Sequence, residues 1–195
     1  MTDELFDVFA GVGHDLRNPL TTIVMGAEHL ARTAADDRTA VAASQIVASA
    51  ARMARLIDQL VDVSRVGVPV AVERADLGAL WRRVVDEMRA LRRDARISID
   101  VAGDATGAWD AAQLVRAGAN LVHDAIAYGT PGAPIAVHVD GRAPEVVVAT
   151  VHSFGAALGL GLYVARRVVV AHRGTIAIAS SNADGTTVRV ELPRR

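Results

Sequence analysis

A histidine at position 14 stands beside an aspartate at 15 and an asparagine at 18. An imidazole acts as a nucleophile when one ring nitrogen is unprotonated and the other is held as N–H by an acceptor, a part that the Asp15 carboxylate suits. In a helix, Asn18 lies one turn beyond His14 on the same face. A lone exposed histidine is usually a bystander, but these neighbours favour nucleophilic chemistry at His14.

The segment that carries His14 has the apolar pattern of a long helix. Spacings of three and four residues, ending with a full heptad, predict a helix over 3–33 with a seam of coiled-coil type. The seam consists of Leu5, Phe9, Val12, Leu16, Pro19, Ile23 and Leu30. His14 follows Val12 by two residues, about 200° around the helix, so we expect it on the outer face. Pro19 lacks an amide hydrogen and loosens the backbone one turn past His14.

A second apolar run repeats this spacing. Its residues are Ile46, Ala50, Met53, Ile57 and Leu60. A polar stretch at 34–38 separates the two runs, which predicts an antiparallel helical hairpin over 1–67. Two amphipathic helices enclose a thin core. Pairing with a second copy in a four-helix bundle buries both seams, and we therefore predict a homodimer.

The pattern changes at 66–69, where a glycine and a proline interrupt the helical spacing. We assign 68–75 to a linker and 76–195 to a second domain. Strands are predicted at 97–101, 135–139, 146–151, 175–180 and 187–192, with Asp140-Gly141 in a hairpin loop. Helices are predicted at 76–93, 110–128 and 160–172, the last with Gly174 at C′. This order predicts an α/β two-layer sandwich, and hence an α+β fold for the chain.

The composition narrows the classes of function. All 21 basic residues of the 195 are arginine, and 22 acidic residues bring the net charge to −1. Lysine Schiff-base chemistry and a strongly basic nucleic-acid surface are therefore excluded. The absence of cysteine excludes thiolate catalysis, disulfides and cysteine-bound zinc. Nothing resembles a signal peptide or a membrane span of about 18 apolar residues, so we expect a cytoplasmic protein.

The heptapeptide His14-Asp-Leu-Arg-Asn-Pro-Leu20 resembles the H-box of sensor histidine kinases. The hairpin around it resembles their dimerisation and histidine-phosphotransfer domain. The resemblance implies that His14 carries a phosphoryl group and passes it to an aspartate of a response-regulator receiver domain. It also implies that Asp15 assists transfer and that Asn18 orients water when the regulator is dephosphorylated. Arg17 is interpreted as a surface or phosphate-neutralising residue.

The second domain resembles the ATP-binding domain of the same family, a Bergerat-type fold. The matching segments are 120–128 for the N-box, 158–166 for the glycine-rich G2 box, and 171–176 with 185–187 for the final hairpin. By this resemblance, a vestigial nucleotide site consists of Asn120, Asp124, Ser153, Gly155, Gly159 and Gly161.

Departures from the family pattern fall on that site. Asp124 replaces the family's magnesium-binding asparagine and keeps an oxygen ligand for a hard cation, while Ala127 replaces a basic residue. Ser153 takes the place of the adenine-recognising aspartate, and no acidic residue occurs from 146 to 183. The lid over the triphosphate is reduced to 156–158. We expect such a site to be poor at phosphoryl transfer from ATP.

Three hypotheses follow. The first is a dimeric histidine phosphotransferase of a phosphorelay, in which His14 exchanges a phosphoryl group with aspartates of receiver domains and Asn18 supports phosphatase action. Its partners are response-regulator receivers and an upstream hybrid kinase, with no nucleic acid and no membrane. The chain then needs no resident metal or cofactor, and Mg²⁺ is expected on the receiver. The second hypothesis is an ATP-dependent autokinase, and the third is a non-catalytic pseudokinase that binds a partner.

The remaining histidines and both tryptophans are interpreted as structural. Surface or packing positions are expected for His29, His138 and His152, which lack metal-ligand spacing. His172 is expected at a helix end, and His123, beside Asp124, is open between a structural and a functional role. Trp81 and Trp109 are expected to anchor the core or its boundary.

Overall fold

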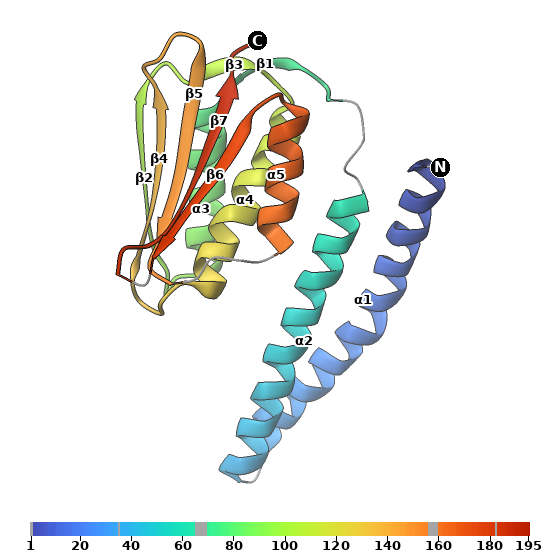
Figure 1. The fold of residues 1–195 in the computed structure, drawn as a ribbon. Helices are drawn as coiled ribbons and strands as arrows, with labels where there is room; N and C mark the ends of the chain where they lie inside the picture. Colours follow the sequence, from blue (N-terminus) through green and yellow to red (C-terminus); the bar gives the residue numbers. More distant parts are fainter. Residues whose placement is uncertain (1, 35, 65–69, 156–159, 182) are drawn as a thin grey trace. The chain divides into compact units, whose positions relative to one another are not determined.

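The computed structural model describes residues 2–34, 36–64, 70–155, 160–181 and 183–195 of the chain. The chain divides into two compact units, Met1–Gly67 and Val68–Arg195, and each is described by itself (Figure 1). The side chains of 2–15, 17, 51–52, 55–56, 58–64 and 160 lie outside the description, although these residues belong to helices.

The first unit is a hairpin of two helices, α1 (Thr2–Thr33) and α2 (Asp37–Ser64), as the apolar spacing predicts (Figure 1). Asp36 begins α2. Its carboxylate accepts hydrogen bonds from the Thr39 hydroxyl at 2.7 Å and from the Thr39 amide at 2.9 Å. These two bonds lower the pKa of Asp36 and satisfy an amide that has no partner inside the helix.

The stripe packed between α1 and α2 differs from the predicted seam. The buried side chains of this unit, among those described, are Leu20, Ala27, Ala43, Ala50 and Ile57. Of the predicted seam only Ala50 and Ile57 are among them. Other residues of the predicted seam are 45% to 50% exposed, namely Leu16, Ile23, Leu30, Ile46 and Met53. Pro19 is also exposed. The predicted seam residues Leu5, Phe9, Val12 and Leu60 lie outside the described side chains. Alanines form most of the narrow contact, so the bulkier apolar stripe stays uncovered within one chain.

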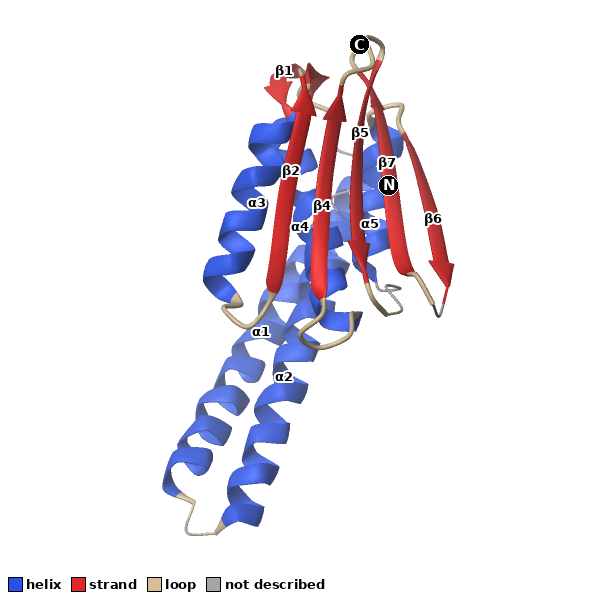
Figure 2. Cartoon of the chain, turned by 90° about the vertical axis from the view of Figure 1, so that its left-hand side faces the viewer, coloured by secondary structure: helices blue, strands red, loops and turns tan. Residues whose placement is uncertain are grey.

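The second unit is a two-layer sandwich in which three helices cover one face of a five-stranded sheet (Figure 2). The strands are β2 (Arg96–Gly103), β4 (Pro134–Gly141), β5 (Val146–Ser153), β6 (Thr175–Ser181) and β7 (Gly185–Pro193), ordered β2-β4-β5-β7-β6. β2 and β4 are parallel, and the other neighbours are antiparallel. The helices are α3 (Leu77–Leu91), α4 (Ala111–Tyr128) and α5 (Leu160–Ala171). The predicted α+β fold is confirmed.

A second, small sheet pairs β1 (Glu73–Asp76) with β3 (Thr106–Trp109) in antiparallel fashion. The sequence pattern indicates neither strand, because each has only four residues and its partner is distant in the chain. Residues 73–75 of the stretch assigned to a linker therefore pair within the second unit.

Both tryptophans belong to the core of the sandwich, as expected. Trp81 is 2% exposed and Trp109 is 1% exposed. The indole N–H of Trp109 donates to the carbonyl of Pro193 at 2.7 Å. Since the chain has only these two tryptophans, their fluorescence reports on the second unit alone.

Asp76 and Asp110 begin α3 and α4, where the sequence places the starts of both helices. Asp76 accepts both its amide hydrogen bonds, from Gly78 and Ala79, on the single oxygen Oδ1. Asp110 uses both oxygens: Oδ1 accepts from the amide of Gln113 and Oδ2 from the amide of Ala71, each at 3.0 Å. The Asp110 cap thus also ties down the chain before β1.

The buried His172 lies just past the end of α5, as expected. Its Nδ1 lies 2.8 Å from the carbonyl of Val168, and its Nε2 accepts from the amide of Asp110 at 3.0 Å. A neutral imidazole with its proton on Nδ1 satisfies both bonds. Burial by itself raises the pKa of Asp110, but the hydrogen bonds from the amides of Gln113 and Ala71 and from the Gln113 side chain outweigh it, and the pKa is lowered.

Two predicted turns are wrong in detail. Asp140 and Gly141 close β4, and the connection follows at 142–145. Gly141 is required there because a Cβ would collide with the carbonyl of Asp104.

The end of α5 differs by one residue from the prediction. Arg173, and not Gly174, takes the left-handed conformation, with φ 59°. The amides of Arg173 and Gly174 donate to the carbonyls of Val170 and Val169, which is a Schellman motif. Gly174 serves a different need, since a Cβ there would collide with the carbonyl of Glu191.

Candidate functional site

The candidate phospho-acceptor segment lies within α1. The side chains of His14, Asp15 and Arg17 lie outside the description, so their geometry stays a prediction. Asn18 is exposed, and its carbonyl accepts a hydrogen bond from the Thr22 hydroxyl at 3.3 Å. Asn18 follows position 14 by one helical turn. Its amide is therefore available to a molecule that approaches this part of α1.

In the sandwich, Asp124 of α4 packs against the start of α5. Asp124 is 3% exposed, and its Oδ2 accepts a hydrogen bond from the amide of Leu162 at 3.2 Å. A Cβ on Gly161 would lie 2.7 Å from the same oxygen, so glycine at 161 permits the contact. Asn120, one turn earlier on α4, is half-buried.

Ser153 and Gly155 lie at the end of β5 and just beyond it. Ser153 is 2% exposed. Gly155 has φ 115° and forms an isolated antiparallel bridge with Gly129, directly after α4. Its carbonyl accepts from the Thr186 hydroxyl at 2.7 Å. These bonds join the chain after β5 to the end of α4 and to β7. Gly159 lies outside the described residues.

Of the described residues in this region, few fit a magnesium nucleotide. A hydroxyl at Ser153 cannot act as the charged acceptor that a carboxylate provides, and 146–183 contains no acidic residue to replace it. The side chain of Asp124 is 5% exposed and already binds a backbone amide. The fit to a magnesium nucleotide is poor for two reasons. Position 153 has no carboxylate, and the carboxylate of Asp124 is buried and hydrogen-bonded within the protein.

The neighbouring histidines do not assemble a metal site. The Nδ1 of His123 lies 3.9 Å from Oδ1 of Asp124, and that of His138 lies 3.0 Å from Oδ2 of Asp100. His152 pairs with the hydroxyl of Thr187. Throughout the described part of the chain, no three histidine or acidic side chains gather as metal ligands would.

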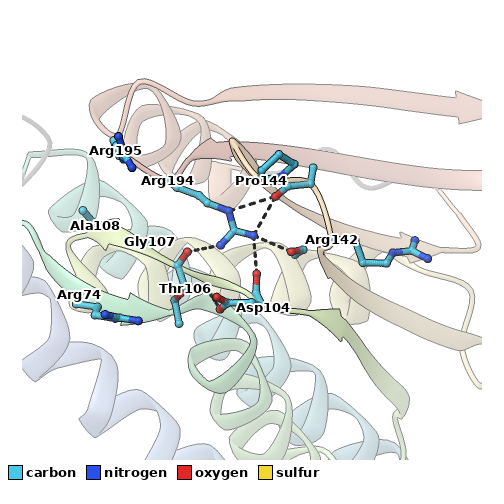
Figure 3. Close-up of a pocket in the computed structure, with 11 residues that line it drawn as sticks. Arg74, Asp104, Thr106, Gly107, Ala108, Arg142, Pro144, Arg194 and Arg195 are labelled. Atoms are coloured by element: carbon cyan, nitrogen blue, oxygen red, sulfur yellow. Dashed lines mark hydrogen bonds between the residues drawn. The ribbon is translucent and has the colours of Figure 1, made fainter.

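Sequence reasoning missed an arginine-lined hollow of about 620 Å³ at the far edge of the sandwich (Figure 3). At its centre, the guanidinium of Arg194 donates to the carbonyls of Asp104, Thr106, Gly141 and Ala143. Arg142 is paired with Asp140 at 2.6 Å. The guanidinium groups of Arg194 and Arg142 are therefore already bound within the protein. Arg194 acts as a clasp, because it joins by hydrogen bonds segments that lie far apart in sequence. A local sequence pattern cannot predict these hydrogen bonds, because the partners are distant in the chain.

Residues 5–68 match the family model of the His Kinase A (phospho-acceptor) domain. A bacteriophytochrome of Pseudomonas aeruginosa is 29% identical over 96% of this chain and 29% of its own length. The signal transduction histidine-protein kinase/phosphatase MprB of Mycobacterium sp. strain KMS is 26% identical over 94% of this chain and 42% of its own. These matches cover both units. Residues 5–68 are thus similar to a His Kinase A domain, and nearly the whole chain is similar to part of these longer relatives.

A solved histidine kinase structure shares the fold of this chain. The structure of the Acinetobacter baumannii histidine kinase AdeS aligns with a TM-score of 0.64 at 18% identity, over 93% of this chain and 98% of that one. This likeness shows that the chain and that histidine kinase share a fold. The chain spans less than half the length of the two curated relatives. In the described part of the chain, no helix is long and apolar enough to cross a membrane.

Proposed function

We propose that the protein is a dimeric histidine phosphotransferase that relays phosphoryl groups between receiver domains. A ring nitrogen of His14 attacks the phosphorus of an aspartyl phosphate. The new P–N bond forms as the bond from phosphorus to the carboxyl oxygen breaks, and the donor leaves as a carboxylate. In the second step, the aspartate of another receiver attacks, a P–O bond forms, and the imidazole leaves. Mg²⁺ is expected on the receiver.

One observation carries this proposal over an ATP-driven mechanism. In the region that corresponds to the nucleotide site, Ser153 provides no carboxylate, and the Asp124 carboxylate is bound to the backbone of α5. Phosphoryl transfer depends on positioning and charge stabilisation at the phosphates. A relay through His14 does not need a nucleotide site, because the phosphoryl group comes from one receiver domain and goes to another.

A homodimer is the expected assembly. The uncovered stripe of the hairpin contains large apolar side chains, among them Ile23 of α1 and Met53 of α2, each 47% exposed. A second copy of the same hairpin offers a matching stripe, and a four-helix bundle buries both. The His Kinase A domain match supports this assembly.

Phosphatase action through Asn18 is the finer part of the proposal. Its side chain is exposed, and an amide can hold a water by one donor and one acceptor contact. The MprB relative is named as a kinase/phosphatase, which supports a second, hydrolytic activity beside transfer.

Autokinase activity is the competing function, and the names of MprB and AdeS as histidine kinases favour it. Radiolabelled ATP and, separately, a radiolabelled phospho-receiver distinguish the two. The proposal expects label on the protein from the receiver only, lost in His14→Gln and kept in His29→Gln. His29 is an exposed histidine of the same helix and is the matched control. Labelling of His14 by ATP contradicts the proposal, and labelling from neither source leaves the pseudokinase hypothesis.

A further inference from the structure

The start of α5 is held by a side chain from another helix. The first amides of any α-helix have no partner within it. In α5, the amide of Leu162 donates to Oδ2 of Asp124 at 3.2 Å. Leu162 is the third residue of α5, the position that a capping side chain commonly serves. Asp124 therefore acts on α5 as an N-cap residue does, although it belongs to α4.

The packing at this contact is close. A Cβ at Gly161 would lie 2.7 Å from Oδ2 and 2.8 Å from Oδ1 of Asp124. Any side chain at 161 would therefore displace the carboxylate from the helix start. The glycine of this segment serves the contact with Asp124, and no bound ligand is needed to explain it.

The charge at this place is the second part of the argument. A helix N-terminus carries a partial positive charge and is a common place for a phosphate to bind. Here a protein carboxylate, with its side chain 5% exposed, occupies the helix start. Its Oδ1 is buried and accepts no hydrogen bond from the described part of the chain. A phosphate brought to the first turn of α5 would meet this negative charge and would have to displace Oδ2 from Leu162.

We propose that Asp124 is a built-in anion that caps α5 in place of a nucleotide phosphate and so keeps nucleotides out of the sandwich. The inference rests on the proposed function, because a relay protein needs the folded domain without its nucleotide. A substitution that kept a carbonyl oxygen for Leu162 but removed the charge would then make the region more tolerant of polyphosphate.

Asp124→Asn tests this, since asparagine keeps the shape and one acceptor oxygen. ATP is titrated with and without Mg²⁺, and binding is followed by tryptophan fluorescence and by the melting temperature. We expect Asp124→Asn to bind ATP about tenfold more tightly than the wild type under both conditions. Asp100→Asn removes the same charge from an exposed position, where the side chain is 79% exposed, and should leave ATP binding unchanged.

Two results of the ATP titrations overturn the inference. One is equal ATP binding by Asp124→Asn and the wild type. The other is Mg²⁺-dependent binding by the wild type that Asp124→Asn loses, because Asp124 would then be a metal ligand. Hydrogen exchange of the Leu162 amide in the wild type is a measurement that needs no variant. Protection that ATP does not change supports the inference, and protection that appears only with ATP contradicts it.

Failure of the proposed function gives a different result. Asp124→Asn should accept phosphoryl groups from a phospho-receiver at the wild-type rate, because Asp124 takes no part in the relay. Loss of receiver-dependent labelling at His14 in the wild type itself contradicts the relay, whatever the ATP titrations show.

Discussion

In the hairpin, the described buried side chains are three alanines, one leucine and one isoleucine, while large apolar residues such as Ile23 remain half-exposed. The sandwich instead encloses Trp81, Trp109 and a continuous cluster of valines and leucines between its sheet and helices. Within one chain, the described part of the hairpin therefore leaves large apolar side chains uncovered, whereas the sandwich encloses a core of its own. We infer that the stability of the first unit depends on protein concentration. The stability of the second unit depends on polar contacts within the chain.

The largest expected effect comes from Ile23→Asp. In a symmetric dimer each subunit would bury one such carboxylate at the interface. We therefore expect the dimer Kd to rise about 1000-fold. Sedimentation or light scattering measures the mass, while tryptophan fluorescence should show an unchanged sandwich. His29→Asp, an exposed substitution on the same helix, should stay dimeric. A dimeric Ile23→Asp protein would remove the basis of the comparison.

The next effect belongs to the sandwich. Arg194→Ala leaves several carbonyls, including those of Thr106 and Gly141, without their donor. We expect the free energy of unfolding to fall by about 2–4 kcal/mol. Urea unfolding followed by tryptophan fluorescence measures it. The exposed neighbour offers the control Arg195→Ala, with an expected change within about 0.5 kcal/mol. Equal effects of the two variants would contradict a clasp at Arg194.

Asp110→Asn sharpens the comparison through pH. Asn can serve the amide of Gln113 or that of Ala71 but not both, so we expect a loss of about 1–3 kcal/mol at pH 7. The folded-state pKa of Asp110 is lowered. Its stabilisation is therefore fully present above the unfolded-state value of about 3.9 and is lost as pH falls through the folded-state pKa.

The matched control for that variant is Asp76→Asn, because Asp76 uses only one oxygen as a cap. Below about pH 4, the melting temperature should fall more steeply for the wild type than for Asp110→Asn. If the melting temperatures of the wild type and Asp110→Asn fall in parallel with pH, Asp110 does not contribute to acid unfolding.

The smallest effect concerns Arg173. Its φ of 59° is one that glycine adopts without strain. Arg173→Gly should therefore stabilise the sandwich by about 1 kcal/mol. Gly174→Ala should do the opposite, because its Cβ would press on the carbonyl of Glu191. Thermal unfolding of both variants measures the difference, and a destabilised Arg173→Gly protein would refute this explanation.

Periodicity predicts the long helices and the five strands of the main sheet because each buries a regular face. It does not predict β1 and β3, whose pairing joins short segments distant in sequence. Ala50 and Ile57 are buried between the helices, but the seam residue Ile23 is 47% exposed, because α1 turns Leu20 and Ala27 inward instead. For the candidate site, the sequence shows that Ser153 is not acidic. It cannot show that Asp124 meets Leu162, which depends on how α4 and α5 cross.

The central place of β5 between β4 and β7 has a consequence for biosynthesis. During translation, β5 acquires its first neighbour early, whereas its second arrives only after α5 and β6 have left the ribosome. Until then one margin of β5 presents unpaired amides and carbonyls beside a valine-rich surface, which invites association between nascent chains. Chaperone demand should therefore peak just before β7 emerges.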